Sequence, residues 1–195
     1  MAISYPLNTP TTIGIESITL RAVNATVASQ SPFTFKQQVI AHQGQRWEAS
    51  VSIPSSRRDL SADWVALVVA MKGQVGSFLL GDPDYVTPRG TVSSCVVTGT
   101  AGDGTVSVVM TGTLKAGDYI QLGAGSSARL HKVLVDKNGS GDLEIWPDLR
   151  STYSSVAAVT NSPKGVFRLS QNVNEWSINN ASAYGISFEA VEVIT

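Results

Sequence analysis

A loop at residues 136–144 has the residue types that could bind calcium. Asp136, Asn138 and Ser140 supply oxygen atoms at the first, third and fifth positions of a calcium loop, and a glycine follows at the sixth. The twelfth position should be a glutamate that binds the ion through both oxygens, but it is Pro147. The residues on either side alternate as in strands, not helices. The sequence therefore predicts a polar turn between two strands, with calcium binding as the alternative.

Three carboxylates are candidates for acid–base chemistry. Asp82 and Asp84 flank Pro83 closely enough to form a carboxylate pair or a site for a hard metal ion. Glu48 is a third candidate, and together these side chains would suit a hydrolase that acts on cell wall. A Gly-Asp-Pro-Asp turn explains the two aspartates without catalysis, because Asp side chains bond to their own backbone in turns. We predict this structural role.

The remaining reactive side chains do not form a recognisable site. His42 and His131 stand far apart in the sequence, and no triad, phosphate-binding or dinucleotide-binding motif is present. The single cysteine, Cys95, lies in a strand-like run and is expected to be a small buried hydrophobe. We therefore predict no catalytic, cofactor-binding or metal-binding residues, no cofactor and no enzyme activity.

The composition limits the partners. The 195 residues include 14 basic and 15 acidic side chains, so the net charge is −1 and the basic surface that binds a phosphate backbone is missing. Charged residues make up only 15% of the chain, against about 25% in an ordinary soluble protein, which favours a surface covered by neighbours. The start lacks the basic and apolar regions of a signal peptide, and no apolar run is long enough for a membrane span. We expect a protein that stays in the cytosol until assembly, without membrane contact.

Most of the sequence alternates apolar and polar residues, as strands with one buried face do. The apolar face of the clearest run consists of Trp47, Ala49, Val51 and Ile53. Residues 18–22 near the start and 186–190 near the end follow the same pattern. Both ends of the chain are therefore predicted to form strands.

One segment, about residues 59–72, has helical periodicity instead. Its apolar stripe consists of Leu60, Trp64, Leu67, Val68 and Met71. We expect Ser61 to cap the start of this helix, and Lys72 and Gly73 to end it. A single amphipathic helix in a β protein packs on a sheet or a barrel end, so Trp64 is expected to be a core anchor.

The composition and the hydrophobic pattern of the sequence change twice along the chain. Prolines and glycines break regular structure between residues 81 and 90, and residues 91–160 then form short strands rich in Thr, Ser, Val and Gly. We predict a β-sandwich or barrel domain with the helix, formed by residues 1–90 together with 161–195, and a small β-barrel domain inserted at residues 91–160. The inserted domain is expected to have its own core, formed by Val106, Val108, Tyr119, Ile120, Val133 and Ile145.

Four segments carry a resemblance to a known family. They are GQRWEA at residues 44–49, MKGQVGSFLLGDP at 71–83, KAGDYIQL at 115–122 and YGISFEAVE at 184–192. In order and texture the chain resembles minor tail proteins of long-tailed bacteriophages, particularly the distal tail family of the tail tip. The resemblance implies a β-sandwich or barrel with a packed helix, assembled as a ring, commonly a hexamer, around the channel through which DNA passes.

The expected function is therefore a structural subunit of the tail tip in the virion, assembled in the host cytoplasm. The implied partners are identical subunits in a ring, the tail tube protein, and the baseplate hub or other tail-tip proteins, with DNA only as passing cargo. The alternative is a carbohydrate-binding β module for receptor recognition. In that case Trp146, Tyr153 or Trp176 would stack on sugars.

Overall fold

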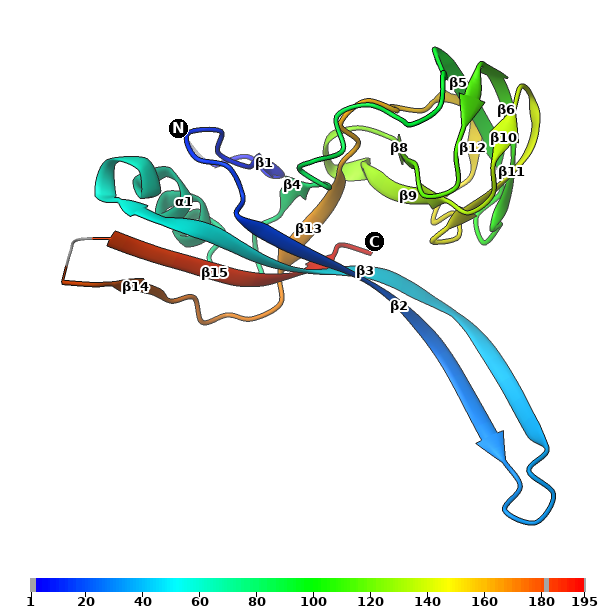
Figure 1. Cartoon of the computed structure of the whole chain (residues 1–195), viewed down its shortest axis with the longest axis horizontal. Coiled ribbons are helices and arrows are strands. Elements are labelled where there is room, and N and C mark those ends of the chain that lie inside the picture. Colours follow the sequence, from blue (N-terminus) through cyan, green and yellow to red (C-terminus); the bar gives the residue numbers. More distant parts are fainter. Residues whose placement is uncertain (1–2, 181–182, 195) are drawn as a thin grey trace.

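The computed structural model describes residues 3–180 and 183–194. Strands account for 51% of the structure and helices for 8%, and the sheets curl into half-barrels (Figure 1). The predicted mainly β fold, with barrel-like or sandwich-like sheets and a single packed helix, is confirmed.

The first sheet has seven strands and combines both ends of the chain. Its order is β1-β4-β13-β15-β3-β2, and β14 pairs with β15 outside this path. The strands are β1 (Leu7–Asn8), β2 (Ser17–Gln30), β3 (Gln37–Arg57), β4 (Phe78–Leu80), β13 (Gly165–Leu169), β14 (Trp176–Ile178) and β15 (Ala183–Glu192). β15 lies antiparallel between β13 and β3, so the strands near the end of the chain join the N-terminal sheet as the alternation predicts.

The central part of the chain forms the other sheets. The larger has the order β12-β5-β6-β11-β9-β8, and the smaller pairs β10 with β7. The elements are β5 (Ser94–Gly99), β6 (Thr105–Thr111), β7 (Thr113–Leu114), β8 (Tyr119–Leu122), the 3-10 helix η1 (Gly125–Ser127), β9 (Arg129–Val133), β10 (Lys137–Asn138), β11 (Gly141–Trp146) and β12 (Tyr153–Ala157). All these strands lie within residues 91–160, and the division into two folding units along these boundaries stays a prediction.

The core of the first sheet follows the predicted alternation. Trp47, Ala49, Val51 and Ile53 are buried, whereas the residues between them are half-buried. Ile186 and Phe188 of β15 are buried in the same core. Alternation with period two therefore identifies the inward face of the sheet correctly.

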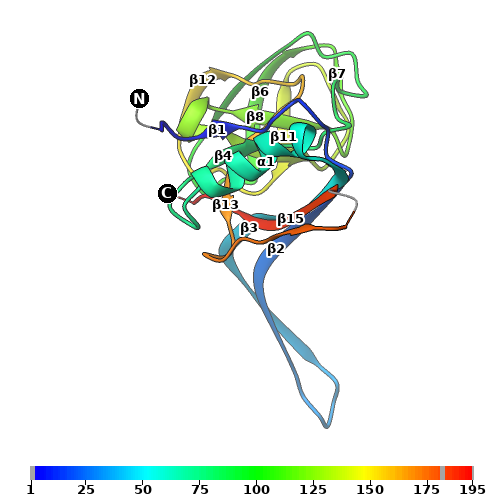
Figure 2. The same cartoon turned by 90° about the vertical axis from the view of Figure 1, so that its left-hand side faces the viewer.

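Helix α1 (Arg58–Ala70) packs on this sheet against β15 and β3 (Figure 2). Trp64 is fully buried, and its indole nitrogen donates to the Ile13 carbonyl at 3.0 Å. The predicted cap is wrong: the N-cap is Arg57, and Ser61 lies inside the first turn, where its hydroxyl bonds to Ser56. Ser61 caps nothing because the helix begins directly from the end of β3, without an intervening loop.

The core of the first sheet includes residues from the other sheet. Tyr119 of β8 and Leu130 of β9 pack with Trp47 and the other core residues of the first sheet. The Trp47 indole nitrogen donates to the Leu130 carbonyl at 2.9 Å. The placement of Tyr119 in a separate inserted core is therefore wrong, although Val106, Val108, Ile120, Val133 and Ile145 do form that second core.

None of the helices among the described residues combines the length and the apolar character that crossing a membrane requires.

Candidate functional site

The most unusual feature is a two-stranded arm, which we define as residues 24–45. It is formed by the distal halves of β2 and β3, which run past the sheet and project from the body (Figures 1 and 2). From residue 24 to residue 44 every side chain is exposed except Ser31, which is half-buried. Beyond the pair Asn24 and Gln45, no described helix or second sheet layer packs on either face of the arm (Figures 1 and 2).

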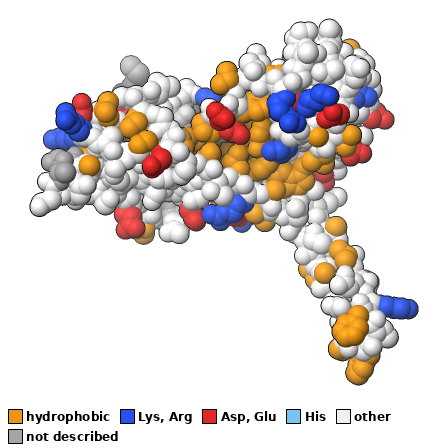
Figure 3. All heavy atoms as spheres, viewed as in Figure 1, with side chains coloured by type: hydrophobic (Ala, Val, Ile, Leu, Met, Phe, Trp, Pro, Cys, Tyr) orange, Lys and Arg blue, Asp and Glu red, His pale blue; other side chains and the backbone are white. Residues whose placement is uncertain are grey.

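The arm exposes apolar side chains on both faces. Val27 pairs with Ile40, and the next pair, Ala28 with Val39, points to the opposite face. Val27, Val39 and Ile40 are each at least half exposed. Apolar side chains lie along the arm and at its end (Figure 3), whereas Lys36 is the only formally charged residue in its sequence.

Two aromatic residues form the tip of the arm. Phe33 is 92% exposed and Phe35 is 72% exposed. The turn is closed by hydrogen bonds from the Ser31 amide to the Lys36 carbonyl at 3.0 Å and from the Phe35 amide to the Ser31 carbonyl at 2.9 Å. Phe35 has a φ of 55°, a left-handed conformation that an aromatic residue rarely adopts. Strained backbone of this kind is found most often at functional sites.

The root of the arm is a β-bulge. Asn24 pairs with Gln45 and Thr26 pairs with Ala41, so the single residue between them on β2 faces three residues on β3. Gly44 lies in this bulge, where an added Cβ would come within 2.8 Å of the Ala25 side chain. The close approach of the two strands therefore requires glycine, and the bulge bends the ribbon where it leaves the body.

The last regular strand pair before the bulge, Asn24 with Gln45, forms hydrogen bonds with residues 146–150, which begin at the end of β11 in the other sheet. The Trp146 indole nitrogen donates to Asn24 Oδ1 at 2.8 Å. The Gln45 side-chain amide donates to Asp148 Oδ2 at 3.2 Å and accepts from the Asp148 amide at 2.7 Å. Arg150 donates to the Gln45 carbonyl. A hollow of about 270 Å³ lies beside these contacts, lined by residues 23–25, 44–46 and Ile194.

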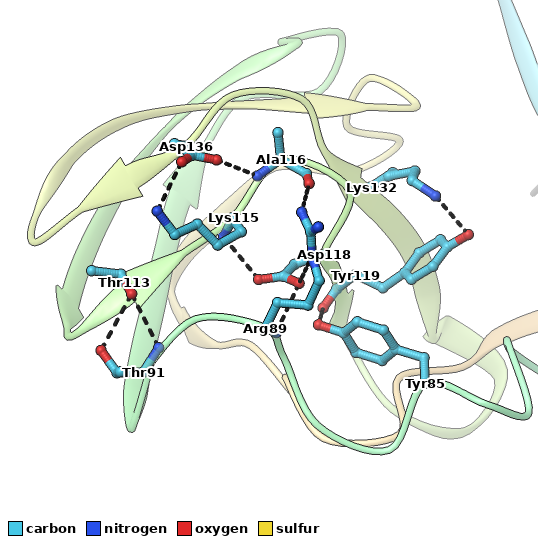
Figure 4. A network of polar contacts seen from close by, with 10 residues as sticks. All are labelled: Tyr85, Arg89, Thr91, Thr113, Lys115, Ala116, Asp118, Tyr119, Lys132 and Asp136. Atoms are coloured by element: carbon cyan, nitrogen blue, oxygen red, sulfur yellow. Dashed lines mark hydrogen bonds and ion pairs between the residues drawn. The ribbon is translucent and has the colours of Figure 1, made fainter.

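The loop at residues 136–144, for which calcium binding was the alternative, makes local hydrogen bonds through Asp136. Asp136 accepts from the Lys115 ammonium at 2.9 Å and from the Ala116 amide at 2.8 Å (Figure 4). These hydrogen bonds hold the pKa of the Asp136 carboxyl below its usual value. The neighbouring Asp118 is fully buried and accepts from the Lys115 amide at 2.8 Å and the Arg89 amide at 3.0 Å. This network fastens the 115–118 turn through hydrogen bonds to the two carboxylates.

The other candidate carboxylates are also engaged locally. Asp82 Oδ1 accepts from the Asp84 amide at 3.0 Å, which is the predicted turn contact. Asp82 lines a hollow of about 220 Å³, and Asp84 does not line it. Glu48 accepts two hydrogen bonds from Arg46, the shorter at 2.6 Å. These three side chains do not converge on one cavity.

The histidines and the cysteine lie in three different surroundings. His42 is exposed in the arm bulge, whereas His131 is buried in β9 and its Nδ1 lies 2.7 Å from the Pro147 carbonyl. Burial lowers the pKa of His131 to about 4. Cys95 is buried in β5 as expected, and burial raises the pKa of its thiol to about 11. Among residues 3–180 and 183–194, no cluster of three or more His, Cys, Asp or Glu side chains could hold a metal ion.

The three aromatic residues considered for sugar binding lie on different elements. Trp146 packs edge-to-face on Trp47, with ring centroids 4.6 Å apart. Tyr153 packs on the second core, and Trp176 lies on β14, where it is 39% exposed. Within the described part of the chain no ring contact joins these three residues.

Sequence reasoning missed the arm and its root. The available signal was an uninterrupted stretch from residue 24 to 45 without an acidic residue, with adjacent apolar residues at Val39 and Ile40 and a Phe-Thr-Phe tip. The hydrogen bonds that hold Asn24 and Gln45 leave no local pattern in the sequence, because the residues that bond to them lie more than 100 positions away.

Comparison with protein families finds no matching family, and comparison with curated proteins finds no similar sequence.

Proposed function

We propose that this protein is a structural, non-enzymatic subunit of a bacteriophage tail tip. In this role it forms part of a ring, a hexamer, that joins the tail tube to the baseplate or tip fibre. The observation that carries the proposal is the arm. A two-stranded ribbon with water on both faces is at best marginally stable alone, and burial of each large side chain such as Phe33 contributes roughly 1.5–3 kcal/mol. Such an arm gains its stability from another protein.

The surroundings of the arm support identical copies as the first partner. β2 is the last strand of its sheet, so its outer edge has backbone groups that another chain can pair with. An arm that contacts a different surface on the next copy makes a head-to-tail interface, which gives a ring when the rotation between successive copies closes. Other parts of the surface remain for the tail tube protein and the baseplate hub.

The remaining features agree with a structural role. The candidate carboxylates Asp82, Glu48 and Asp136 bond to local backbone or basic groups, which supports a role without catalysis. The net charge of −1 suits a conduit for DNA, because a basic lining would retain the passing strand.

Electron microscopy of phage particles that contain this chain tests the proposal. We expect the chain in a ring of rotational symmetry at the end of the tail tube, with the arm in contact with a neighbouring subunit. Density for the chain in an isolated peripheral spike, without contacts around the tail axis, would contradict the proposal.

A further inference from the structure

The direction of the arm is set at its root. The ribbon rises about 3.3 Å per residue, so it reaches roughly 20 Å beyond the bulge. A rotation of about 20° at the root would move the tip by roughly 7 Å over that length. The contacts that fix the root therefore determine the position of Phe33 and Phe35 at the tip.

The bulge bends the ribbon at the root of the arm. Between the pair Asn24 and Gln45 and the pair Thr26 and Ala41 the regular ladder is interrupted. Interrupted pairing removes hydrogen bonds that would hold the two halves of the ribbon in line. The bent ribbon departs from the pair Asn24 and Gln45, which lies beyond Glu48, the last residue of β3 that pairs with β15. The orientation of this pair therefore needs contacts from outside the ribbon.

Those contacts come from one short segment, residues 146–150, which we call the clamp. Trp146 binds the β2 side of the root through Asn24, and Asp148 binds the β3 side through Gln45. Both atoms of the Gln45 amide are used, because it donates to the Asp148 carboxylate and accepts from the Asp148 backbone. The clamp therefore fixes both strands on the body side of the bulge.

The clamp is itself firmly attached to the rest of the protein. The Trp146 ring packs on Trp47 of the first core, and Leu149 is buried in the second core. The Pro147 carbonyl lies 2.7 Å from Nδ1 of the buried His131. Since the Pro147 oxygen can only accept, this nitrogen carries the proton. A displacement of residues 91–160 relative to the first sheet would therefore be transmitted to the root.

We propose that the block formed by residues 91–160 aims the arm, with Trp146, Asp148 and Arg150 as the positioning residues. This gives the central block a task within the same chain, beyond any contact of its own. The consequence for ring assembly rests on the proposed function, whereas the effect on the arm direction does not.

The test is a distance measurement in the purified full chain. Spin labels at Gln38→Cys in the arm and Val69→Cys on α1 report the arm direction by pulsed electron–electron resonance. The native Cys95 is buried, and its thiol pKa is raised to about 11, so it does not take up label at neutral pH. We expect a narrow distribution of distances in the otherwise unchanged protein.

Two variants release the clamp differently. Gln45→Leu removes both side-chain amide contacts, and Trp146→Phe removes only the indole donor while an aromatic ring remains beside Trp47. In each variant we expect the width of the distance distribution to at least double, with a melting temperature within a few degrees of the parent. Gln43→Leu is the matched control, because it makes the same change in the bulge at a residue without a clamp contact.

The outcomes separate the two proposals. Unchanged widths in Gln45→Leu and Trp146→Phe, or equal broadening in Gln43→Leu, would overturn the aiming role. If Gln45→Leu does not fold, Trp146→Phe decides alone. If the distance distribution broadens in these two variants but the mass of the assembled ring is unaffected, the aiming role stands. The role of the arm in ring assembly is then contradicted.

Discussion

Residues 47–53 and residues 37–44 of β3 pair with the same neighbour, β2, but only the first group has a core against it. Trp47 and Val51 are buried in the first core, whereas Val39 and Ile40 lie in solvent. Residue type alone does not separate these halves, since both contain large apolar side chains. The difference shows that strand formation and burial are separate properties. Under the proposed function, a neighbouring subunit covers the exposed half.

The largest expected effect is on the free energy of unfolding, and it is seen by substituting one aromatic residue in each region. Trp64→Ala removes a fully buried side chain and should lower the free energy of unfolding by about 3–5 kcal/mol. Phe33→Ala, at a side chain that is 92% exposed, should change it by less than about 0.5 kcal/mol in the isolated chain. Urea denaturation measures both. A loss above about 1 kcal/mol for dilute Phe33→Ala would mean that the tip packs within its own chain.

The second prediction concerns the pH dependence of stability, to which the buried His131 should contribute. His131 is buried, and its pKa is lowered from 6.5 to about 4, so the unfolded chain binds a proton first as the pH falls. Stability should therefore decrease from about pH 6.5 to about pH 4, by about 3 kcal/mol from this group. His131→Asn keeps a donor for the Pro147 carbonyl and should flatten this part of the curve. An equally steep decrease in His131→Asn would assign the acid sensitivity to other groups.

The fold was more predictable than the site, for a physical reason. Burial on one face leaves a period of two in the sequence, so Trp47, Ala49 and Val51 identify their strand directly. A contact surface leaves no such period, and the arm carries apolar residues on both faces at Val39 and Ile40. A hydrophobic pattern predicts that a residue will be covered, but not by which molecule.

Long-range polar contacts were beyond prediction for a related reason. Gln45 has its partner at Asp148, and neither residue stands in a recognisable motif. Tyr119 was assigned to the wrong core because its strand alternates normally, and only the closing of the two sheets on each other places its ring against Trp47. Local signals can specify an element and its buried face, whereas the meeting of two sheets depends on the whole topology.

The smallest expected effect concerns calcium. Lys115 and the Ala116 amide already bond to the Asp136 carboxylate, and the loop lacks a ligand at position twelve. The melting temperature should therefore be the same in excess calcium and in excess chelator, in the parent and in Asp136→Ala. A calcium-dependent rise of several degrees that disappears in Asp136→Ala would restore the metal-binding alternative.

The most direct test of the account removes the arm. Replacing residues 25–44 by an Asn-Gly turn joins Asn24 to Gln45, which already face each other across the ribbon, so a two-residue hairpin closes without strain. Light scattering with size-exclusion chromatography then gives the mass of each protein at high concentration. We predict a ring with the mass of six 20.6 kDa chains for the complete protein, and a folded monomer with an unchanged melting temperature for the armless one. Equal masses for the two proteins, or an armless chain that does not fold, would contradict the account.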